Sequence, residues 1–224
     1  SAGPDPVTWE FTVSRVDRRL LEVDVEGSLA HVAGLAASRL VTPEDERALT
    51  AGLRQILDEA RAGQFAWLES DEDVHSAVER RLGEITGVVA GKLRTGRSRN
   101  DQIALDLRLW MRSAARHAVA GIAAMTRALM AAARSAGEAV VPCHTHLQQA
   151  QAVPLAHVLL AHAWPLVRDV DRFRDALARI AVSPLGASAG GGSRLPLDPA
   201  VPARELGLDR VFDNSLDAGG ARDA

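Results

Sequence analysis

The sequence has 224 residues, 47% of them apolar, and 29 acidic residues against 26 basic ones give a formal net charge of −3. These values are typical of a folded globular protein, and they argue against a disordered chain and against the basic surplus of many nucleic-acid-binding proteins. No run of about 18 apolar residues indicates a membrane span, and the first residues lack the charged and apolar regions of a signal peptide.

The composition also favours one fold class and one compartment. Aromatic residues make up 4% of the chain, tyrosine is absent, and alanine is abundant, a mixture that favours closely packed helices over β-sheets. The single cysteine, Cys143, cannot form a disulfide within the chain, so the protein does not depend on an oxidising compartment. We therefore expect an all-α protein in the cytoplasm.

Two helix starts are visible in the first half of the sequence. The stretch Thr42 to Asp45 combines an N-cap hydroxyl, a proline and acidic residues, and it predicts a helix that runs to about residue 62. Ser70 precedes three acidic residues in the same manner, and apolar residues then recur at spacings of three and four. This pattern predicts a second helix near residues 71–86.

Two longer helical patterns follow. Apolar residues keep one face from residue 100 to about 137 and again from 154 to about 182, where Pro165 is expected to kink the helix. The short connection over 138–153 predicts that the two long helices are antiparallel neighbours in a helical bundle. One chain cannot complete such a bundle, so we expect oligomerisation. The glycine-rich run over 187–193 predicts an end to helical order.

The densest polar constellation runs from Thr95 to Asp101, immediately before the longest predicted helix. Free backbone N–H groups and the helix dipole attract a carboxylate there, Arg99 can bind it bidentately, and Ser98 and Asn100 can add hydrogen bonds. The segment therefore indicates an anion-binding loop. A plain helix cap with solvated arginines is the competing interpretation.

A second constellation, Pro142 to Gln149, lies between the long helices and contains His144 and His146. Imidazole titrates near neutrality, so these side chains are candidates for acid–base chemistry, although two histidines in a turn are often ordinary surface residues. With Cys143 they are too close together in sequence to indicate a zinc site, and we expect no metal.

A third constellation joins Asp24 to Ser28 with Asp73 to His75. Taken alone, these residues look like helix caps and surface side chains. The other histidines lie within helical patterns, where packing or solvent exposure is their expected role, and we assign no chemistry to His31, His117, His157 and His162.

Together these segments resemble the argininosuccinate lyases, members of the fumarase and aspartase superfamily. Gly91 to Gln102 is similar to the first signature region of that family, and Thr145 to Gln148 is similar to the second. Five shorter stretches are similar as well, namely 24–28, 72–75, 79–82, 184–186 and 214–218. The similarity implies an N-terminal helical domain over residues 1–95 and part of a long-helix central bundle over 96–224.

The resemblance implies a set of site residues. The side chains implied to bind the carboxylate and amino acid groups of the substrate are Ser28, Ser98, Arg99, Asn100 and Thr145. His146 is implied to be the histidine of an acid–base pair. The family further implies homotetramers with shared active sites, a role in arginine biosynthesis, and no cofactor.

The implied reaction is a β-elimination that splits argininosuccinate into arginine and fumarate. A proton leaves the carbon next to a carboxylate, the resulting aci-carboxylate is stabilised by Arg99 and nearby N–H donors, and the carbon–nitrogen bond breaks. His146 is the candidate acid for the departing guanidino nitrogen, and the direction in which it transfers the proton is left open.

The family's second catalytic group is a serine in a flexible loop that follows the stretch matched by 214–217. The sequence ends at Ala224 before that loop, so we expect the 224-residue chain to lack this group and the rest of the bundle. Arg94 and Cys143-His144 replace residues common in the family, which leaves the substrate open. The alternatives are a related lyase acting on another substituted succinate and a noncatalytic structural homologue; binding of nucleic acid is disfavoured by the net charge.

Overall fold

The computed structural model describes residues 5–13 and 15–223, and it divides into two units. Unit 1 comprises Ser1–Trp110 with Ala181–Ala224, and unit 2 comprises Met111–Ile180. Residues 1–4, part of the start for which we predicted no signal peptide, and Ala224 lie outside the described residues. Helices form most of the described chain, which confirms the all-α prediction. None of the described helices combines the length with the apolar character that crossing a bilayer requires.

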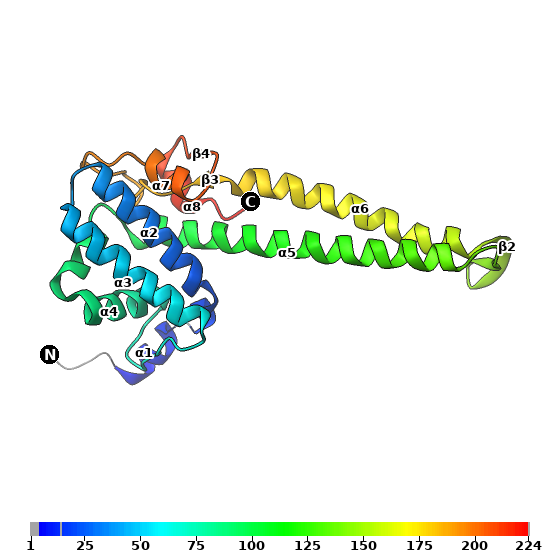
Figure 1. Ribbon diagram of the computed structural model, residues 1–224, viewed down its shortest axis with the longest axis horizontal. Helices are drawn as coiled ribbons and strands as arrows, with labels where there is room; N and C mark the ends of the chain where they lie inside the picture. The colour runs from blue at the N-terminus through cyan, green and yellow to red at the C-terminus, as the bar shows by residue number, and fades with distance from the viewer. Residues whose placement is uncertain (1–4, 14, 224) are drawn as a thin grey trace. The chain divides into compact units, whose positions relative to one another are not determined.

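Unit 1 is a layered group of helices with a few short elements around it (Figure 1). Its elements are α1 Pro6–Thr12, η1 Val16–Leu20, α2 Leu21–Ala37, α3 Pro43–Arg61, α4 Val74–Thr86, η2 Gly87–Arg94, the first part of α5 Arg99–Ser135, β3 Val182–Ser183, α7 Ala200–Glu205, β4 Arg210–Val211 and α8 Ser215–Gly220. Strands β3 and β4 pair in parallel. Helix α2 packs against both α3 and α4, and the core between them contains Val25, Leu49, Leu53, Val78 and Leu82.

The two early helices begin with reciprocal caps. Helix α3 starts as predicted, because the Oγ1 of Thr42 accepts from the N–H of Asp45 and the Asp45 carboxylate accepts from the N–H of Thr42. Helix α4 starts three residues later than predicted. Its cap is Asp73, whose carboxylate accepts from the N–H of Ser76 at 2.6 Å, so the start near residue 71 was wrong.

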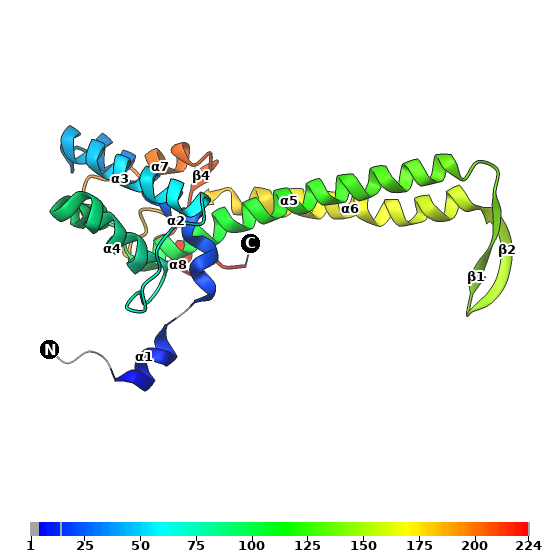
Figure 2. The same cartoon turned by 60° about the horizontal axis from the view of Figure 1, so that its bottom comes forward.

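Unit 2 contains the rest of α5, a hairpin of β1 Val140–Thr145 and β2 Gln148–Pro154, and α6 Leu155–Ile180. Both long helices are confirmed, and within unit 2 they run side by side in opposite directions in both views (Figure 2). The connection between them, for which the sequence predicted only a short segment over 138–153, is an antiparallel hairpin. His146 and Leu147 form its turn with φ values of 49° and 63°, the left-handed conformations of a type I′ turn.

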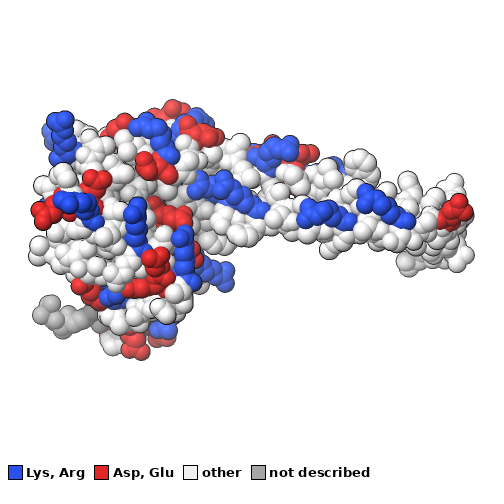
Figure 3. Space-filling model, viewed as in Figure 1, with Lys and Arg blue, Asp and Glu red and all other residues white. Residues whose placement is uncertain are grey.

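Large apolar side chains are exposed along unit 2. The most exposed are Met125, Val140, Leu147 and Trp164, each with more than half of its surface open to solvent. On the face drawn in Figure 3, the surface of this unit is mostly uncharged, with a few separated arginines. Over α2, α3 and α4 of unit 1, acidic and basic side chains are mixed on the same face.

Candidate functional site

The predicted anion-binding loop of unit 1 is fixed where it leaves η2. The carbonyl oxygen of Thr95 lies 3.0 Å from Nε2 of His31 on α2, so the neutral imidazole donates to it. Gly96 follows with a φ of 69°, and a Cβ at this position would collide with the side chain of Leu197. Glycine is therefore required where the loop turns toward α5.

The loop ends in the cap of α5. The Oγ of Ser98 accepts from the N–H of Asn100 at 3.3 Å, and Oδ1 of Asp101 accepts from the N–H of Ser98 at 3.0 Å. The second carboxylate oxygen of Asp101 accepts from the N–H groups of Gly186 and Ser188. Burial raises the pKa of Asp101, although these hydrogen bonds and the charge of Arg97 oppose the shift. The cap thus joins the loop to the glycine-rich segment near 187–193.

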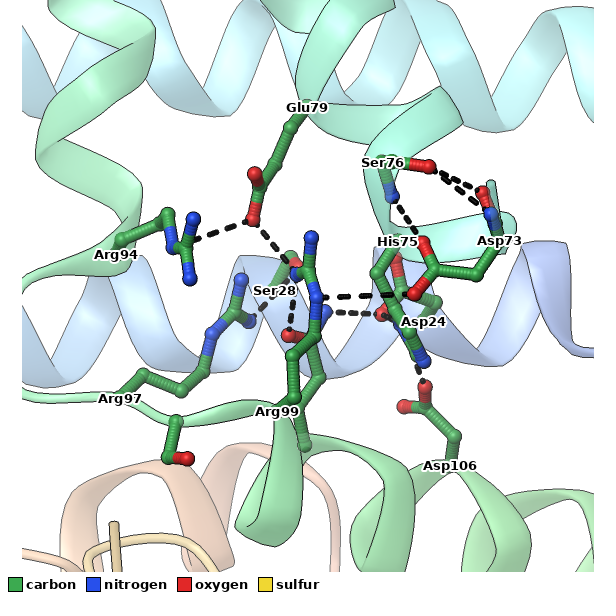
Figure 4. A network of polar contacts seen from close by, with 12 residues as sticks. Asp24, Ser28, Asp73, His75, Ser76, Glu79, Arg94, Arg97, Arg99 and Asp106 are labelled. Carbon is green, nitrogen blue, oxygen red and sulfur yellow. Dashed lines mark hydrogen bonds and ion pairs between the residues drawn. The ribbon is translucent and has the colours of Figure 1, made fainter. Parts of the chain in front are cut away.

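Arg97 points inward from the loop, toward α2. Its Nη1 donates to the Oγ of Ser28 at 2.9 Å, and Ser28 is completely buried (Figure 4). The other terminal nitrogen, Nη2, is covered and makes no hydrogen bond within the described chain. Burial lowers the pKa of Arg97, while the negative charges of Asp24 and Asp106 act in the opposite direction. The charges of two buried carboxylates therefore act on this guanidinium.

Arg99, the first residue of α5, faces α4 instead. Its Nη1 donates to Oε1 of Glu79 at 2.7 Å and to Oε1 of Gln102 at 3.0 Å (Figure 4). Its Nε lies 3.9 Å from Oδ2 of Asp73, and Glu79 also faces Arg94, with 3.7 Å between Nε and Oε1. Arginine side chains therefore gather around one glutamate at the start of α5.

Three buried titratable groups lie beneath these arginines. Nδ1 of His75 is 2.9 Å from Oδ1 of Asp24 and 3.5 Å from Oδ2 of Asp106, and the amide nitrogen of Gln102 also donates to Oδ1 of Asp24. Burial raises the pKa of Asp106 well above its ordinary value, with a further contribution from the charge of Asp24. Burial opposes ionisation of Asp24 too, but hydrogen bonds from His75 and Gln102 and the charges of His75 and Arg97 lower its pKa.

The same three groups have the donor types of a metal site. One atom each of Asp24, His75 and Asp106 lies within 4.8 Å of the others. However, Oδ1 of Asp24 already accepts two hydrogen bonds, and the positive charge of Arg97 acts on both carboxylates. Both oxygens of Asp106 and Oδ2 of Asp24 are buried and make no hydrogen bond within the described chain. We therefore assign the group as a buried cluster whose acidic members balance the guanidinium of Arg97, with Asp24 held by hydrogen bonds from His75 and Gln102.

The predicted site residues fall into both units. Ser28, Ser98, Arg99 and Asn100 are in unit 1, where the loop and α2 bring them into one region. The other two predicted residues, Thr145 and His146, lie at the exposed tip of the hairpin in unit 2.

Sequence reasoning misjudged several members of the network in unit 1. Taken alone, Asp24 and His75 looked like surface or capping residues, but both are buried, because α2 and α4 pack against each other at these positions. Ser28, which the resemblance implied to be a substrate contact, is buried as well. Gln102 and Asp106 were not singled out. Their spacing of three and seven residues from Arg99 places all three on one helix face, which was a usable signal.

The arrangement in unit 1 suits a carboxylate ligand. Nη2 of Arg99 makes no hydrogen bond to any described residue, and Arg99 stands in the first turn of a long helix whose dipole favours negative charge. Guanidinium groups bind carboxylates with two parallel hydrogen bonds. The region therefore has the chemistry to hold and orient a small acid.

Comparison with known proteins agrees with the resemblance seen in the sequence motifs. A family model described as "Lyase" matches residues 4–224. The argininosuccinate lyase of Roseiflexus sp. (strain RS-1) is 48% identical over 207 residues, covering 92% of this chain and 46% of its own length. That of Maricaulis maris (strain MCS10) is 45% identical over 224 residues, covering 100% and 48%. The chain thus spans about half the length of the curated relatives it matches.

Solved structures show the same similarity at the level of the fold. An EDDS lyase variant with bound fumarate has a TM-score of 0.81 and 26% identity, over all of this chain and 45% of the other. A fumarate lyase:delta crystallin from Brucella melitensis bound to cobalt has a TM-score of 0.76 over 93% of this chain and 51% of the other. At 19% identity, the second likeness shows the fold alone.

Proposed function

Because this chain belongs to that lyase family, within the fumarase and aspartase superfamily, we propose that the complete protein splits argininosuccinate into arginine and fumarate in arginine biosynthesis. The resemblance predicted from the motifs is thereby confirmed, and so is the long-helix fold. The observation that carries the proposal is the guanidinium of Arg99, which two acceptors hold at the start of α5 while Nη2 stays available for a carboxylate.

In this proposal Arg99 binds a substrate carboxylate through its remaining N–H donors. Ser98 and Asn100 add hydrogen bonds from the same helix end. Negative charge that develops on the carboxylate as the proton leaves the neighbouring carbon is then stabilised by donors that are already in place. Ser28 remains a proposed substrate contact; its side chain is completely buried and accepts from Arg97, so this contact requires the residues around it to move.

We assign the acid–base role to His146 and substrate orientation to Thr145. Both are exposed at the hairpin tip, so a site that uses them needs further surfaces around the tip. A homotetramer with shared active sites supplies such surfaces, and the exposed apolar side chains of unit 2 support association. We also propose a cytoplasmic location and chemistry that uses no cofactor. Light scattering tests the tetramer, and cell fractionation tests the location.

The direct test uses the full-length gene product. Incubation with argininosuccinate should release fumarate, which is followed by its ultraviolet absorbance. The substitution His146→Asn should lower kcat by about 100-fold or more, as expected on removal of a general acid or base. His144→Asn is the matched control, because His144 is an exposed histidine two residues earlier, on strand β1 of the same hairpin. Equal activity of the two variants contradicts the role of His146.

A related lyase is the second candidate. The likeness to the EDDS lyase structure covers this whole chain, so elimination from another substituted succinate is compatible with the same fold. A full-length protein that ignores argininosuccinate but releases fumarate from another substituted succinate supports this candidate. A tetramer that turns over neither compound supports the noncatalytic homologue.

A further inference from the structure

The amide of Gln102 connects the buried network of unit 1 to Arg99. Its nitrogen donates to Oδ1 of Asp24, and its oxygen accepts from Nη1 of Arg99 at 3.0 Å. Gln102 is 96% buried, since only 4% of its surface is exposed. Both ends of one amide are therefore used, one toward the core and the other toward the candidate site.

The carboxylate of Asp24 sets the orientation of this amide. An ionised carboxylate only accepts hydrogen bonds, so the amide must turn its nitrogen toward Asp24. The same carboxylate oxygen accepts from Nδ1 of His75 at 2.9 Å, and the burial of both side chains leaves them little freedom. With the nitrogen fixed, the amide oxygen has to face Arg99.

The orientation of Arg99 follows from the two acceptors it meets. Nη1 carries two hydrogens, and Glu79 and Gln102 accept one each. The guanidinium is planar, so fixing Nη1 also fixes the edge formed by Nε and Nη2. Within the described chain Nη2 has no hydrogen-bond acceptor, and Nε has only Asp73 at 3.9 Å. That edge has the geometry for a bidentate carboxylate.

We propose that Gln102 is a positioning residue, which transmits the orientation set by Asp24 and His75 to the guanidinium of Arg99. This inference rests on the proposed function, because it assigns Arg99 to substrate binding. It makes substrate affinity depend on a side chain that has no contact with substrate. Glu79 alone leaves the guanidinium free to rotate about a single hydrogen bond, so the second acceptor is what fixes its plane.

The test is a double-mutant cycle in the full-length protein. Gln102→Met keeps the length of the side chain and removes both hydrogen bonds. Hydrogen bonds to charged groups contribute about 1.5–3 kcal/mol, so kcat/KM should fall by about tenfold or more, mainly through KM. In an Arg99→Ala background, Gln102→Met should have almost no further effect. Equal effects in both backgrounds would overturn the proposal.

Two controls keep the result clear. Gln55→Leu replaces an exposed glutamine whose amide, among the described residues, donates to Glu59 on the same helix, and it should leave kcat/KM unchanged. If Gln102→Met does not fold, Gln102→Asn replaces it, because the shorter amide cannot reach both partners. An Asn variant with wild-type KM also contradicts the proposal.

A crystal structure of the Gln102 variant gives a readout that is independent of turnover. Arg99 should lose its single orientation, and a wild-type guanidinium position would overturn the inference. Failure of the wild-type protein to release fumarate from any substituted succinate would instead overturn the proposed function and leave this structural readout intact.

Discussion

Nδ1 of His75 donates to Oδ1 of Asp24 over 2.9 Å, and this bond joins the first turn of α4 to the first turn of α2. Neither side chain has more than 3% of its surface exposed. A polar contact this deep cannot be replaced by water when one partner is removed. It therefore both orders the region beneath the candidate site and makes the fold sensitive to substitution there.

Removal of the histidine should destabilise unit 1. His75→Phe keeps an aromatic ring but leaves the buried Asp24 carboxylate without its main donor, so we expect a loss of about 3 kcal/mol in the free energy of unfolding. Urea unfolding at neutral pH measures this loss. His117→Phe, at an exposed position on α5, should change the free energy by less than about 0.5 kcal/mol. Similar losses in both variants contradict the assignment.

Replacement by asparagine should have opposite effects on stability at Asp106 and at Asp24. The raised pKa of Asp106 means that the folded protein keeps a proton that the unfolded chain has released above about pH 4. Folding is therefore penalised as the pH rises, by at most about 1.4 kcal/mol per pH unit. Asp106→Asn removes this penalty, so its stability relative to the wild type should increase between pH 4 and pH 8.

Asp24→Asn should bring no such gain in stability. It removes the ionised carboxylate that accepts two hydrogen bonds and balances Arg97, so it should destabilise the protein by about 3 kcal/mol at pH 7. Urea unfolding of both variants across this pH range checks the pair. Equal losses in the two variants would show that both carboxylates are ionised.

The loop before α5 should make the protein acid-sensitive through His31. Burial lowers the pKa of His31 to about 3, with help from the charge of Arg97, and the bond to Thr95 opposes the shift. Below pH 6.5 His31 becomes protonated in the unfolded chain but stays neutral in the folded protein. The free energy of unfolding therefore falls toward pH 3, by up to about 1.4 kcal/mol per pH unit.

His31→Gln keeps an N–H donor for the Thr95 carbonyl and removes the titration. Its stability relative to the wild type should increase as the pH falls from 6.5 to 4, as measured by thermal unfolding. Parallel curves for the two proteins would contradict the assignment of His31 as a neutral buried group.

Alanine substitutions at two helical glycines, Gly52 and Gly83, should change stability in opposite directions. A Cβ at Gly52 of α3 would lie 2.7 Å from Cδ1 of Leu82 and 2.8 Å from Cγ2 of Thr86, so Gly52→Ala should cost about 1–3 kcal/mol. Gly83 of α4 has nothing within 4 Å of that position, and Gly83→Ala should stabilise by about 0.5–1 kcal/mol. Calorimetric melting of both variants tests whether α3 and α4 pack as closely as described.

The sequence was informative where structure is local. The cap at Thr42 and the period of the long helices depend on neighbours within one or two turns, and both predictions are confirmed. The hairpin was missed because its turn is His146-Leu147 rather than the Asn-Gly or Asp-Gly pair that usually marks a type I′ turn. Its strands are also mostly exposed, so they show no alternation of apolar and polar residues.

The site was only partly predictable for a related reason. The apolar pattern at the start of α5 favoured a buried face through Ile103 and Leu107, but both are only half-buried, while Asp106 and Arg108 are buried. Hydrophobic periodicity assumes that buried residues are apolar, whereas here polar side chains are buried beside the apolar Leu105 and Leu109. The partners of the polar side chains on α2 and α4 are many residues away, so no local pattern predicts them.

The turn at His146 and Leu147 has a consequence for how the proposed chemistry can vary among relatives. The backbone at the tip is set by two left-handed residues, but no described side chain holds the imidazole by a hydrogen bond. In the proposed acid–base role, the groups that tune the reactivity of His146 therefore come from other surfaces. Selection can alter its reactivity by changing those surfaces, while the hairpin itself stays the same.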